Sequence, residues 1–375
     1  MSLKCGIVGL PNVGKSTLFN ALTKAGIAAE NYPFCTIEPN VGIVEVPDPR
    51  LAKLADLAKP QKLLPAVVEF VDIAGLVAGA SKGEGLGNQF LANIREVDAI
   101  AEVVRIFEDD NVIHVEGALD PLRDIETINL ELILADLETV TKRLASVERD
   151  AKRGEKTAIV EKGALEKIKE ALESEKLATS VHLTTDEALI IKGMHLLTAK
   201  PFLYVLNKKS GGKNLDEMNS AQGGPASGWD PRYHKLMNFL NEQKAHSVVV
   251  DARIEHELSE LDPNEKDTYR GELGATDDGI NNLIRGGYDL LGLITYFTTG
   301  EDETRAWTVK YNSTAPVAGM AIHTDFKDKF IRAEVVAYDD LVRVGSYAKA
   351  REQGLVRTEG KEYIVKDGDV IEFKI

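Results

Sequence analysis

The sequence predicts an α/β protein in which one sheet-based domain is interrupted by a long helical hairpin and followed by a small C-terminal sheet. Three observations predict this class. A glycine-rich turn at 9–16 joins a short apolar run to a helix-compatible segment. From Asp120 onward, apolar residues recur at helical spacing, and strand-like runs lie on both sides of that stretch. From Arg305 onward, short β-rich runs return with a different composition.

The glycine-rich turn fits the phosphate-binding pattern G-x-x-x-x-G-K-[ST] through Gly9, Gly14, Lys15 and Ser16. Glycines let inward-pointing backbone N–H groups wrap a phosphate, and the following helix adds the positive end of its dipole. Lys15 would reach the β- and γ-phosphate oxygens, and the Ser16 hydroxyl would ligate Mg²⁺. A turn that serves packing alone has no need of Lys followed by Ser at this spacing. We therefore interpret it as a nucleotide site.

Composition narrows the class of protein. A chain of 375 residues is too long for one ordinary core, which predicts two or three domains. The formal net charge of −15 disfavours broad adhesion to DNA or to anionic membranes. Two cysteines do not indicate a disulfide framework, and the most apolar stretch, 63–80, carries Glu69 and Asp72 and is therefore no membrane span. Because the sequence lacks a signal-peptide pattern, we expect a cytoplasmic protein.

Two later segments have the features of nucleotide switches. The loop-like stretch 31–36 ends in Thr36, which would complete the Mg²⁺ shell when a γ-phosphate is present. Taken alone, Thr36 is better interpreted as an ordinary surface threonine. The β-rich run 66–75 supports the switch, because it ends in Asp72-x-x-Gly75. Asp72 can hold Mg²⁺ through water, and the Gly75 N–H can approach the γ-phosphate.

Two residues bear on the attacking water. Leu76 stands where many GTPases carry the glutamine that orients this water. An apolar side chain cannot do so, which predicts slow hydrolysis or a polar contact from another group. His114 follows the strand-like run 100–107 in an acidic loop and could position the water. The alternative, a loop histidine without a role, is slightly favoured by sequence alone.

A long helix is predicted from Asp120-Pro121, with apolar residues at coiled-coil spacing. A second helical segment from Thr157 predicts an antiparallel hairpin that turns near Gly154. The tip of this hairpin is locally positive. Its basic residues are Lys142, Arg143, Arg149, Lys152, Arg153 and Lys156, against Glu148, Asp150 and Glu155.

After the hairpin, the strand-like run 202–206 leads into Asn207-Lys208-Lys209-Ser210, where a base-recognition motif belongs. Residues 210–229 are interpreted as a long mobile loop. A helix over 233–243 and a strand over 247–250 would close the first domain. Beyond a linker at 292–303, we predict a small sheet packed on one helix. The predicted strands are 305–310, 331–336, 362–365 and 370–374, and the predicted helix is 339–350.

These motifs together resemble the Obg-like ATPase family, the YchF subfamily of translation-factor-related P-loop NTPases. The resemblance covers essentially the whole chain. It rests on the segments 9–16, 31–36, 72–76 and 79–89. At the carboxyl end, the segments 305–307, 323–326 and 365–370 resemble the family's β-grasp TGS module.

The resemblance implies a fold with three parts. These are a P-loop NTPase domain of the G-protein-like type, an inserted antiparallel coiled-coil hairpin and a C-terminal β-grasp TGS domain. We expect the NTPase domain at 1–128 and 201–290, the inserted helical domain at 129–200 and the TGS domain at 291–375.

The motifs and the resemblance together give the expected site residues and cations. The expected catalytic residues are Lys15, Leu76 and His114. The expected ligands of Mg²⁺ are Ser16, Thr36 and Asp72, and Asn12 matches an asparagine that helps bind a stimulating K⁺ in related proteins. The expected nucleotide contacts are Asn12, Val13, Gly14, Lys15, Ser16, Thr17, Gly75, Asn207, Lys208 and Ser210.

The base contact is the departure from the family pattern, because relatives commonly place an acidic residue where this chain has Ser210. A hydroxyl matches the adjacent donors of guanine poorly, so ATP should bind more tightly than GTP. The competing interpretation is that Asp216 or Glu217 reads guanine.

The resulting hypothesis is a slow, Mg²⁺-dependent ATPase that acts as a conformational switch on the ribosome. The alternative is a nucleotide-gated ribosome- or RNA-binding regulator with incidental hydrolysis. This alternative includes a regulator that uses GTP. We expect ATP, more weakly GTP, and the ribosome or its RNA as partners, no DNA or membrane partner, and a monomeric chain.

Overall fold

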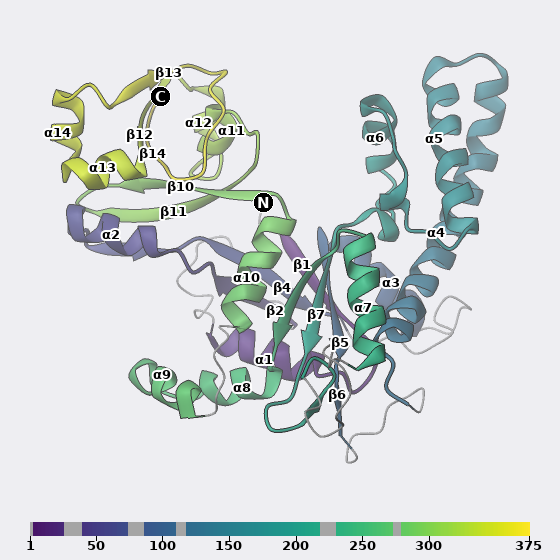
Figure 1. Cartoon of the computed structure of the whole chain (residues 1–375). Helices are drawn as coiled ribbons and strands as arrows, with labels where there is room; N and C mark the ends of the chain where they lie inside the picture. The colour runs from purple at the N-terminus through teal and green to yellow at the C-terminus, as the bar shows by residue number, and fades with distance from the viewer. Residues whose placement is uncertain (1–2, 26–39, 74–85, 110–117, 218–229, 273–278) are drawn as a thin grey trace.

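The computed structural model of the chain describes residues 3–25, 40–73, 86–109, 118–217, 230–272 and 279–375 (Figure 1). Two six-stranded sheets organise this described part, and a helical hairpin projects from the first sheet. The α/β class with an inserted hairpin and a second, C-terminal sheet is therefore confirmed. In the described residues, no helix is both long and apolar enough to cross a membrane.

The first sheet has the order β2-β4-β1-β5-β7-β9, and only its edge strand β2 runs antiparallel to its neighbour. Its strands are β1 (Lys4–Val8), β2 (Val41–Glu45), β4 (Val67–Asp72), β5 (Ala99–Arg105), β7 (Phe202–Asn207) and β9 (His246–Val250). All of β5 is buried, as expected for a strand in the middle of a parallel sheet. The carboxyl ends of parallel strands meet at one edge, which brings the ends of β1, β4 and β7 together.

Helices connect these strands or follow them along the chain. They are α1 (Lys15–Ala25), α3 (Leu86–Glu96), α7 (Pro231–Glu242), α8 (Ala252–Ser259), α9 (Pro263–Glu272) and α10 (Gly279–Leu290). Buried Cys5 belongs to the core under them, and burial raises the pKa of its thiol to about 12. Cys5 is thus an inert packing residue.

The inserted hairpin consists of α4 (Pro121–Lys152) and α5 (Lys156–Glu173), as predicted. Asp120 caps α4 by accepting a hydrogen bond from the Arg123 N–H, with Pro121 in the first turn. The turn between the helices has Gly154 at a φ of +87°, in the left-handed region that glycine enters readily. An apolar seam joins the helices. It includes Ile133, Val140, Leu165, Ile168 and Leu172.

The chain returns from the hairpin through three short helices. They are η3 (Ala178–Ser180), α6 (Thr185–Lys192) and η4 (Leu197–Ala199). The buried Asp136 carboxylate of α4 fixes the last of them, because it accepts bonds from the Leu197 N–H, the Thr198 N–H and the Thr198 hydroxyl. The expected boundary at 128/129 falls inside α4, which runs without a break from the first sheet to the tip.

The second sheet has the order β13-β12-β14-β10-β11-β3. Its C-terminal strands are β10 (Leu293–Thr299), β11 (Glu303–Lys310), β12 (Arg332–Ala337), β13 (Arg357–Glu359) and β14 (Asp369–Lys374). The short helices α11 (Ala315–Gly319) and α12 (Asp325–Asp328) lie between β11 and β12. Tyr296 packs in one apolar cluster with Ala315 and Ala318 of this region, whereas its neighbour Phe297 belongs to the cluster that contains Leu341 and Ala350. Helices therefore cover both faces of the second sheet, whereas the sequence predicted a sheet packed on one helix.

Several predictions for this region are wrong in detail. The predicted linker 292–303 contains β10, whose β-branched and aromatic residues outweigh the two flanking glycines. The predicted helix 339–350 is two helices, α13 (Tyr338–Val344) and α14 (Tyr347–Glu352), because Gly345 ends the first with a φ of +81°. The predicted strand 362–365 makes only an isolated bridge from Ile364 to Thr314.

Two further segments differ from prediction. The predicted loop 210–229 contains β8 (Lys213–Asn214), which pairs with β6 (Phe107–Glu108). The first half of the chain also contributes α2 (Pro49–Ala58) and β3 (Lys62–Leu64), and β3 is an edge strand of the second sheet. Edge pairing between distant segments leaves little trace in local sequence.

A buried acid lies where α4 packs on the first sheet. Glu102 of β5 is fully buried, and both its carboxylate oxygens have no hydrogen-bond partner among the described residues. Burial, and then the charge of Asp124 on α4, raise the pKa of Glu102 well above its ordinary value. Tyr204 of β7 faces the same acid, and its pKa is also raised by burial and by Glu102.

We predict that Glu102 makes stability fall as pH rises. The unfolded chain loses this proton near pH 4.5, whereas the folded chain keeps it to higher pH. The folded state thus binds more protons across that window, so the free energy of unfolding declines from about pH 4.5 upward until the folded pKa is passed. Glu102→Gln should flatten this decline in urea unfolding measured over a pH series. The exposed Glu96→Gln is the matched control, and parallel curves for wild type and Glu102→Gln would refute the prediction.

Candidate nucleotide-binding site

The turn after β1 requires glycine at two positions. At Gly14, φ is +100°, and an added Cβ would lie 2.3 Å from the Asn207 Nδ2 atom. At Gly9, φ is +155°, and an added Cβ would lie 2.6 Å from the Val103 carbonyl oxygen. Both contacts are shorter than any real side chain tolerates, so the loop wraps tightly against β5 and β7. The sequence pattern of a phosphate loop therefore has the backbone geometry that such a loop needs.

Lys15 begins α1 and is 8% exposed. Its Nζ donates a hydrogen bond to the Leu10 carbonyl oxygen at 2.7 Å, which holds the ammonium group inside the ring of loop residues. Burial lowers the pKa of Lys15, and the charge of Asp72 partly offsets this effect. The loop thus holds one cation in a position to meet an anion.

Asp72 ends β4 on the same edge of the sheet. Burial raises the pKa of Asp72, and the Lys15 charge lowers it, so the two groups lie close enough to influence each other. The Asp72 Oδ1 atom is buried and has no hydrogen-bond partner in the described residues. The Ser16 side chain is exposed at the start of α1. Carboxylate and hydroxyl oxygens are ligands that a hard divalent cation prefers, so the chemistry of these residues fits Mg²⁺.

Asn207 joins three segments at the end of β7 and is 4% exposed. Its Nδ2 donates to the Val13 carbonyl oxygen at 2.8 Å, and its Oδ1 accepts from the Ala252 N–H at 3.0 Å. The phosphate loop, β7 and the turn after β9 are therefore locked together. The next residue, Lys208, donates its backbone N–H to the Val250 carbonyl oxygen.

Sequence analysis did not identify two acidic residues that hold the segment 208–210, where the base-recognition motif was expected. Asp251 is 7% exposed, and its carboxylate accepts bonds from the N–H groups of Ser210, Arg253 and Ile254. Asp109 pairs with the Lys209 ammonium at 2.6 Å. The only sequence signal for Asp251 is that an aspartate before a helical segment is a good N-cap.

The remaining predicted residues fall into two groups. Val13 is buried in the loop, Thr17 is half-buried in α1, and Asn12 adopts a left-handed backbone with a φ of +63°. Thr36, Gly75, Leu76 and His114 lie outside the described residues. The structure thus brings Lys15, Asp72 and Asn207 to one edge of the sheet.

Two family models match separate parts of the chain. Residues 4–143 match a family described as a 50S ribosome-binding GTPase. Residues 293–375 match the YchF-GTPase C-terminal family, described as a protein of unknown function. Over the full length, the chain is 54% identical to the ribosome-binding ATPase YchF of Bacillus subtilis, covering 100% of this chain and 99% of that protein. The chain belongs to the YchF family.

Other YchF proteins agree over the same length. The ribosome-binding ATPase YchF of Escherichia coli O157:H7 is 50% identical, again over 100% of this chain and 99% of its own. Among solved structures, the YchF GTPase of Schizosaccharomyces pombe matches with a TM-score of 0.85 and 36% identity, covering 100% of this chain and 98% of that one. The YchF fold therefore accounts for the hairpin and the C-terminal sheet as well as for the nucleotide domain.

We predict that Asn207→Ala destabilises the fold by about 2–4 kcal/mol, because it leaves the Val13 carbonyl and the Ala252 N–H without their partner in a buried place. Nucleotide affinity should fall with it, since the loop loses its tie to β7. Urea unfolding and nucleotide titration measure the two effects. Asn238→Ala, on the exposed face of α7, is the control and should change stability by less than about 0.5 kcal/mol. Equal stability of Asn207→Ala and wild type would contradict the assignment.

Proposed function

We propose that this chain is a Mg²⁺-dependent ATPase that works in the cytoplasm as a ribosome-associated nucleotide switch. One observation carries the proposal: Lys15, Asp72 and Asn207 converge on the wrapped loop at the carboxyl edge of the first sheet. The relatives named ribosome-binding ATPase supply the class of nucleotide and the partner. We expect the protein to act as a monomer.

Catalysis in this proposal is electrostatic. Lys15 places a desolvated positive charge where the β- and γ-phosphates bind, and a charge held in advance stabilises the negative charge that develops during transfer. Ser16 and Asp72, with Thr36, would hold Mg²⁺, which neutralises phosphate charge when bound. Leu76 cannot orient water, so His114 is the residue we propose for this task, and turnover should be slow. Asn12 is the residue we propose beside a stimulating K⁺.

The base side supports ATP over GTP. Guanine presents two adjacent donors that a carboxylate matches, whereas Ser210 offers one hydroxyl. The nearby Asp251 carboxylate already accepts three backbone bonds, which favours a positioning role for it. Glu217 accepts a bond from the Asn214 amide, which disfavours it as a reader of guanine. The part of the GTP-using alternative that relies on Glu217 therefore has less support.

The first test is a titration of ATP and GTP with the wild-type protein and with Lys15→Ala. ATP should bind more tightly than GTP. The variant should lose about 10- to 150-fold in affinity, since a hydrogen bond to a charged group contributes about 1.5–3 kcal/mol, and should lose hydrolysis. Lys24→Ala, in the exposed last turn of the same helix, is the control. Tighter GTP binding would support the GTP-using alternative, and unchanged hydrolysis in Lys15→Ala would overturn the site.

The hairpin tip is the surface that we propose for RNA. The structure refines which cations are available there. Lys142, Arg143, Lys152 and Arg153 each pair with a carboxylate of the hairpin. Arg149 and Lys156 are exposed and have no ion-pair partner in the described hairpin. These two residues can therefore meet phosphates without first breaking an ion pair.

We predict that the double variant Arg149→Glu, Lys156→Glu binds ribosomes more weakly, with a salt dependence shallower by about two phosphate contacts. Co-sedimentation over a salt series measures both effects. The control, Lys176→Glu with Lys235→Glu, changes net charge equally at exposed sites away from the tip. If the two double variants bind alike, the tip is not the RNA contact.

A further inference from the structure

The segment between β2 and β4 leaves the first sheet and enters the second. A hydrogen bond from the Val46 N–H to the Ala66 carbonyl oxygen at 2.8 Å closes the neck of this excursion. Between these residues, α2 packs against β10 and β11, and β3 extends the second sheet (Figure 1). Two neighbouring strands of the nucleotide sheet are thus connected through the C-terminal sheet.

The strand β3 is held to β11 by backbone pairing. Lys62, Leu63 and Leu64 lie opposite residues 303–305 in parallel register. Two more bonds precede the ladder, from the Gln61 N–H to the Glu301 carbonyl at 3.0 Å and from the Lys62 N–H to the Asp302 carbonyl at 3.1 Å. These amides report directly on the docking of the two units.

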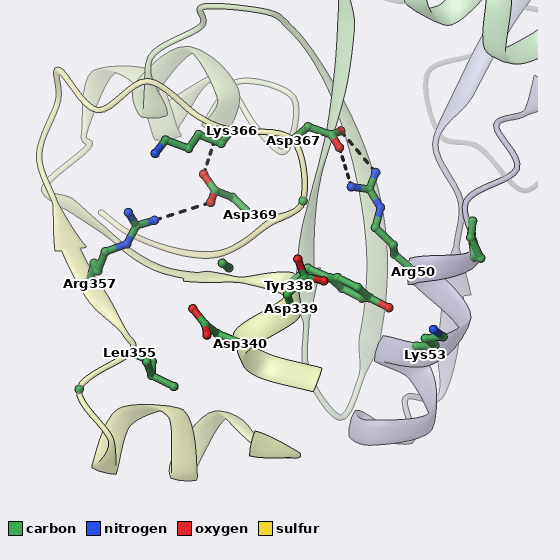
Figure 2. A pocket seen from close by; sticks show the side chains of 14 residues that line it. Arg50, Lys53, Tyr338, Asp339, Asp340, Leu355, Arg357, Lys366, Asp367 and Asp369 are labelled. Atoms are coloured by element: carbon green, nitrogen blue, oxygen red, sulfur yellow. Dashed lines mark hydrogen bonds and ion pairs between the residues drawn. The ribbon is translucent and has the colours of Figure 1, made fainter. Parts of the chain in front are cut away.

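Arg50 of α2 forms a clamp across the same joint, shown in Figure 2. Its guanidinium donates to the Asp48 carboxylate at 2.7 Å and to the Asp367 carboxylate at 2.6 Å, and it lies 5.2 Å from the Phe297 ring centre. Asp367 also accepts the Thr295 N–H at 2.9 Å, so the clamp reaches the backbone of β10. Planar bidentate contacts of this kind fix orientation as well as distance.

The joint around the clamp combines a hollow lined by charged groups with an apolar core, because Leu51 and Leu54 of α2 belong to the same buried cluster as Phe297. A cavity of about 670 Å³ lies beside Arg50, with walls from α2 on one side and from α13 and the loop before β14 on the other. Figure 2 shows Lys53, Asp339 and Lys366 around it. Apolar packing is non-directional, whereas the clamp and the pairing of β3 are directional contacts. The clamp and β3 therefore fix the orientation in which the C-terminal sheet docks on α2.

The other end of this connection is the nucleotide site. β4 ends at Asp72, which faces Lys15, and the Asp72 N–H donates to the Asn40 carbonyl just before β2. β2 and β4 pair from Val41↔Val71 to Glu45↔Val67, a ribbon of roughly 17 Å that runs from Asp72 to the neck. The backbone pairing along this ribbon is a continuous physical connection between the nucleotide site and the neck.

We propose that nucleotide binding at Lys15 and Asp72 and the docking of the C-terminal sheet on α2 through Arg50 stabilise each other. This inference rests on the proposed nucleotide site. It adds the C-terminal sheet as a part of the molecule whose docking is coupled to nucleotide binding. The clamp fixes α2, the neck and the β2–β4 ribbon, and the ribbon holds Asp72 in place. Because coupling is reciprocal, a ligand that orders Asp72 also favours the docked C-terminal sheet.

Hydrogen exchange on the wild-type chain tests the coupling without any substitution. With ATP or GTP and Mg²⁺, the amides of Gln61 and Lys62 should become about fivefold or more protected, the low end of typical coupling. The amides of the distant α5 helix are the internal control and should not change. Unchanged or decreased protection of Gln61 and Lys62 at saturating nucleotide would overturn the coupling.

Substitution tests the other direction. Arg50→Gln and Asp367→Asn should each weaken nucleotide binding about fivefold or more, although neither residue belongs to the nucleotide site. The control is Arg332→Gln, at an exposed arginine of β12 whose ion pair in the described part of the chain is with Glu334 of the same strand, and it should bind as wild type does. If the wild type binds no nucleotide, the proposed function itself fails. If it binds and all three variants bind equally well, the nucleotide site stands and the coupling is refuted.

Discussion

The candidate site depends most on the two hydrogen bonds that the Asn207 carboxamide makes. Its two polar atoms close one hydrogen bond to the phosphate loop and one to the turn after β9, so three separate stretches of chain share one anchor. Gly14 has no Cβ at the point where the amide nitrogen arrives. The loop therefore keeps its wrapped shape through the protein's own contacts, and Lys15 is held inside it. A site that is already shaped requires less ordering when its ligand arrives.

Much of this fold could be predicted from sequence, because its parts follow local rules. The phosphate loop has a fixed spacing, the hairpin has an apolar seam and a start with proline in its first turn, and the strand that ends at Asp72 is a β-rich run. The parts that escaped prediction depend on distant partners. β3 is three residues long and becomes a strand only because β11 lies beside it. β10 was hidden by flanking glycines, although Tyr296 and Phe297 are among the largest fully buried side chains described.

The same distinction applies within the site. Lys15, Ser16 and Asp72 could be found because phosphate and Mg²⁺ demand particular residue types at particular spacings. Asp251 could be recognised only as an N-cap, since its contact with the Ser210 N–H joins segments that are distant in sequence. The charge of the hairpin tip was visible in sequence, whereas the ion pair of Arg143 with Glu161 joins two helices and required the structure.

The continuity of α4 has a mechanical consequence. Its first turns bury Ile125 and Ile128 against the nucleotide sheet, and its other end is the hairpin tip. A helix of 32 residues is about 48 Å long, at a rise of 1.5 Å per residue. A tilt of about 10° at the root would carry the tip through roughly 8 Å, since displacement grows in proportion to the length of the arm. A small change in the tilt of α4 where it packs on the first sheet would thus produce a displacement of several ångströms at the hairpin tip.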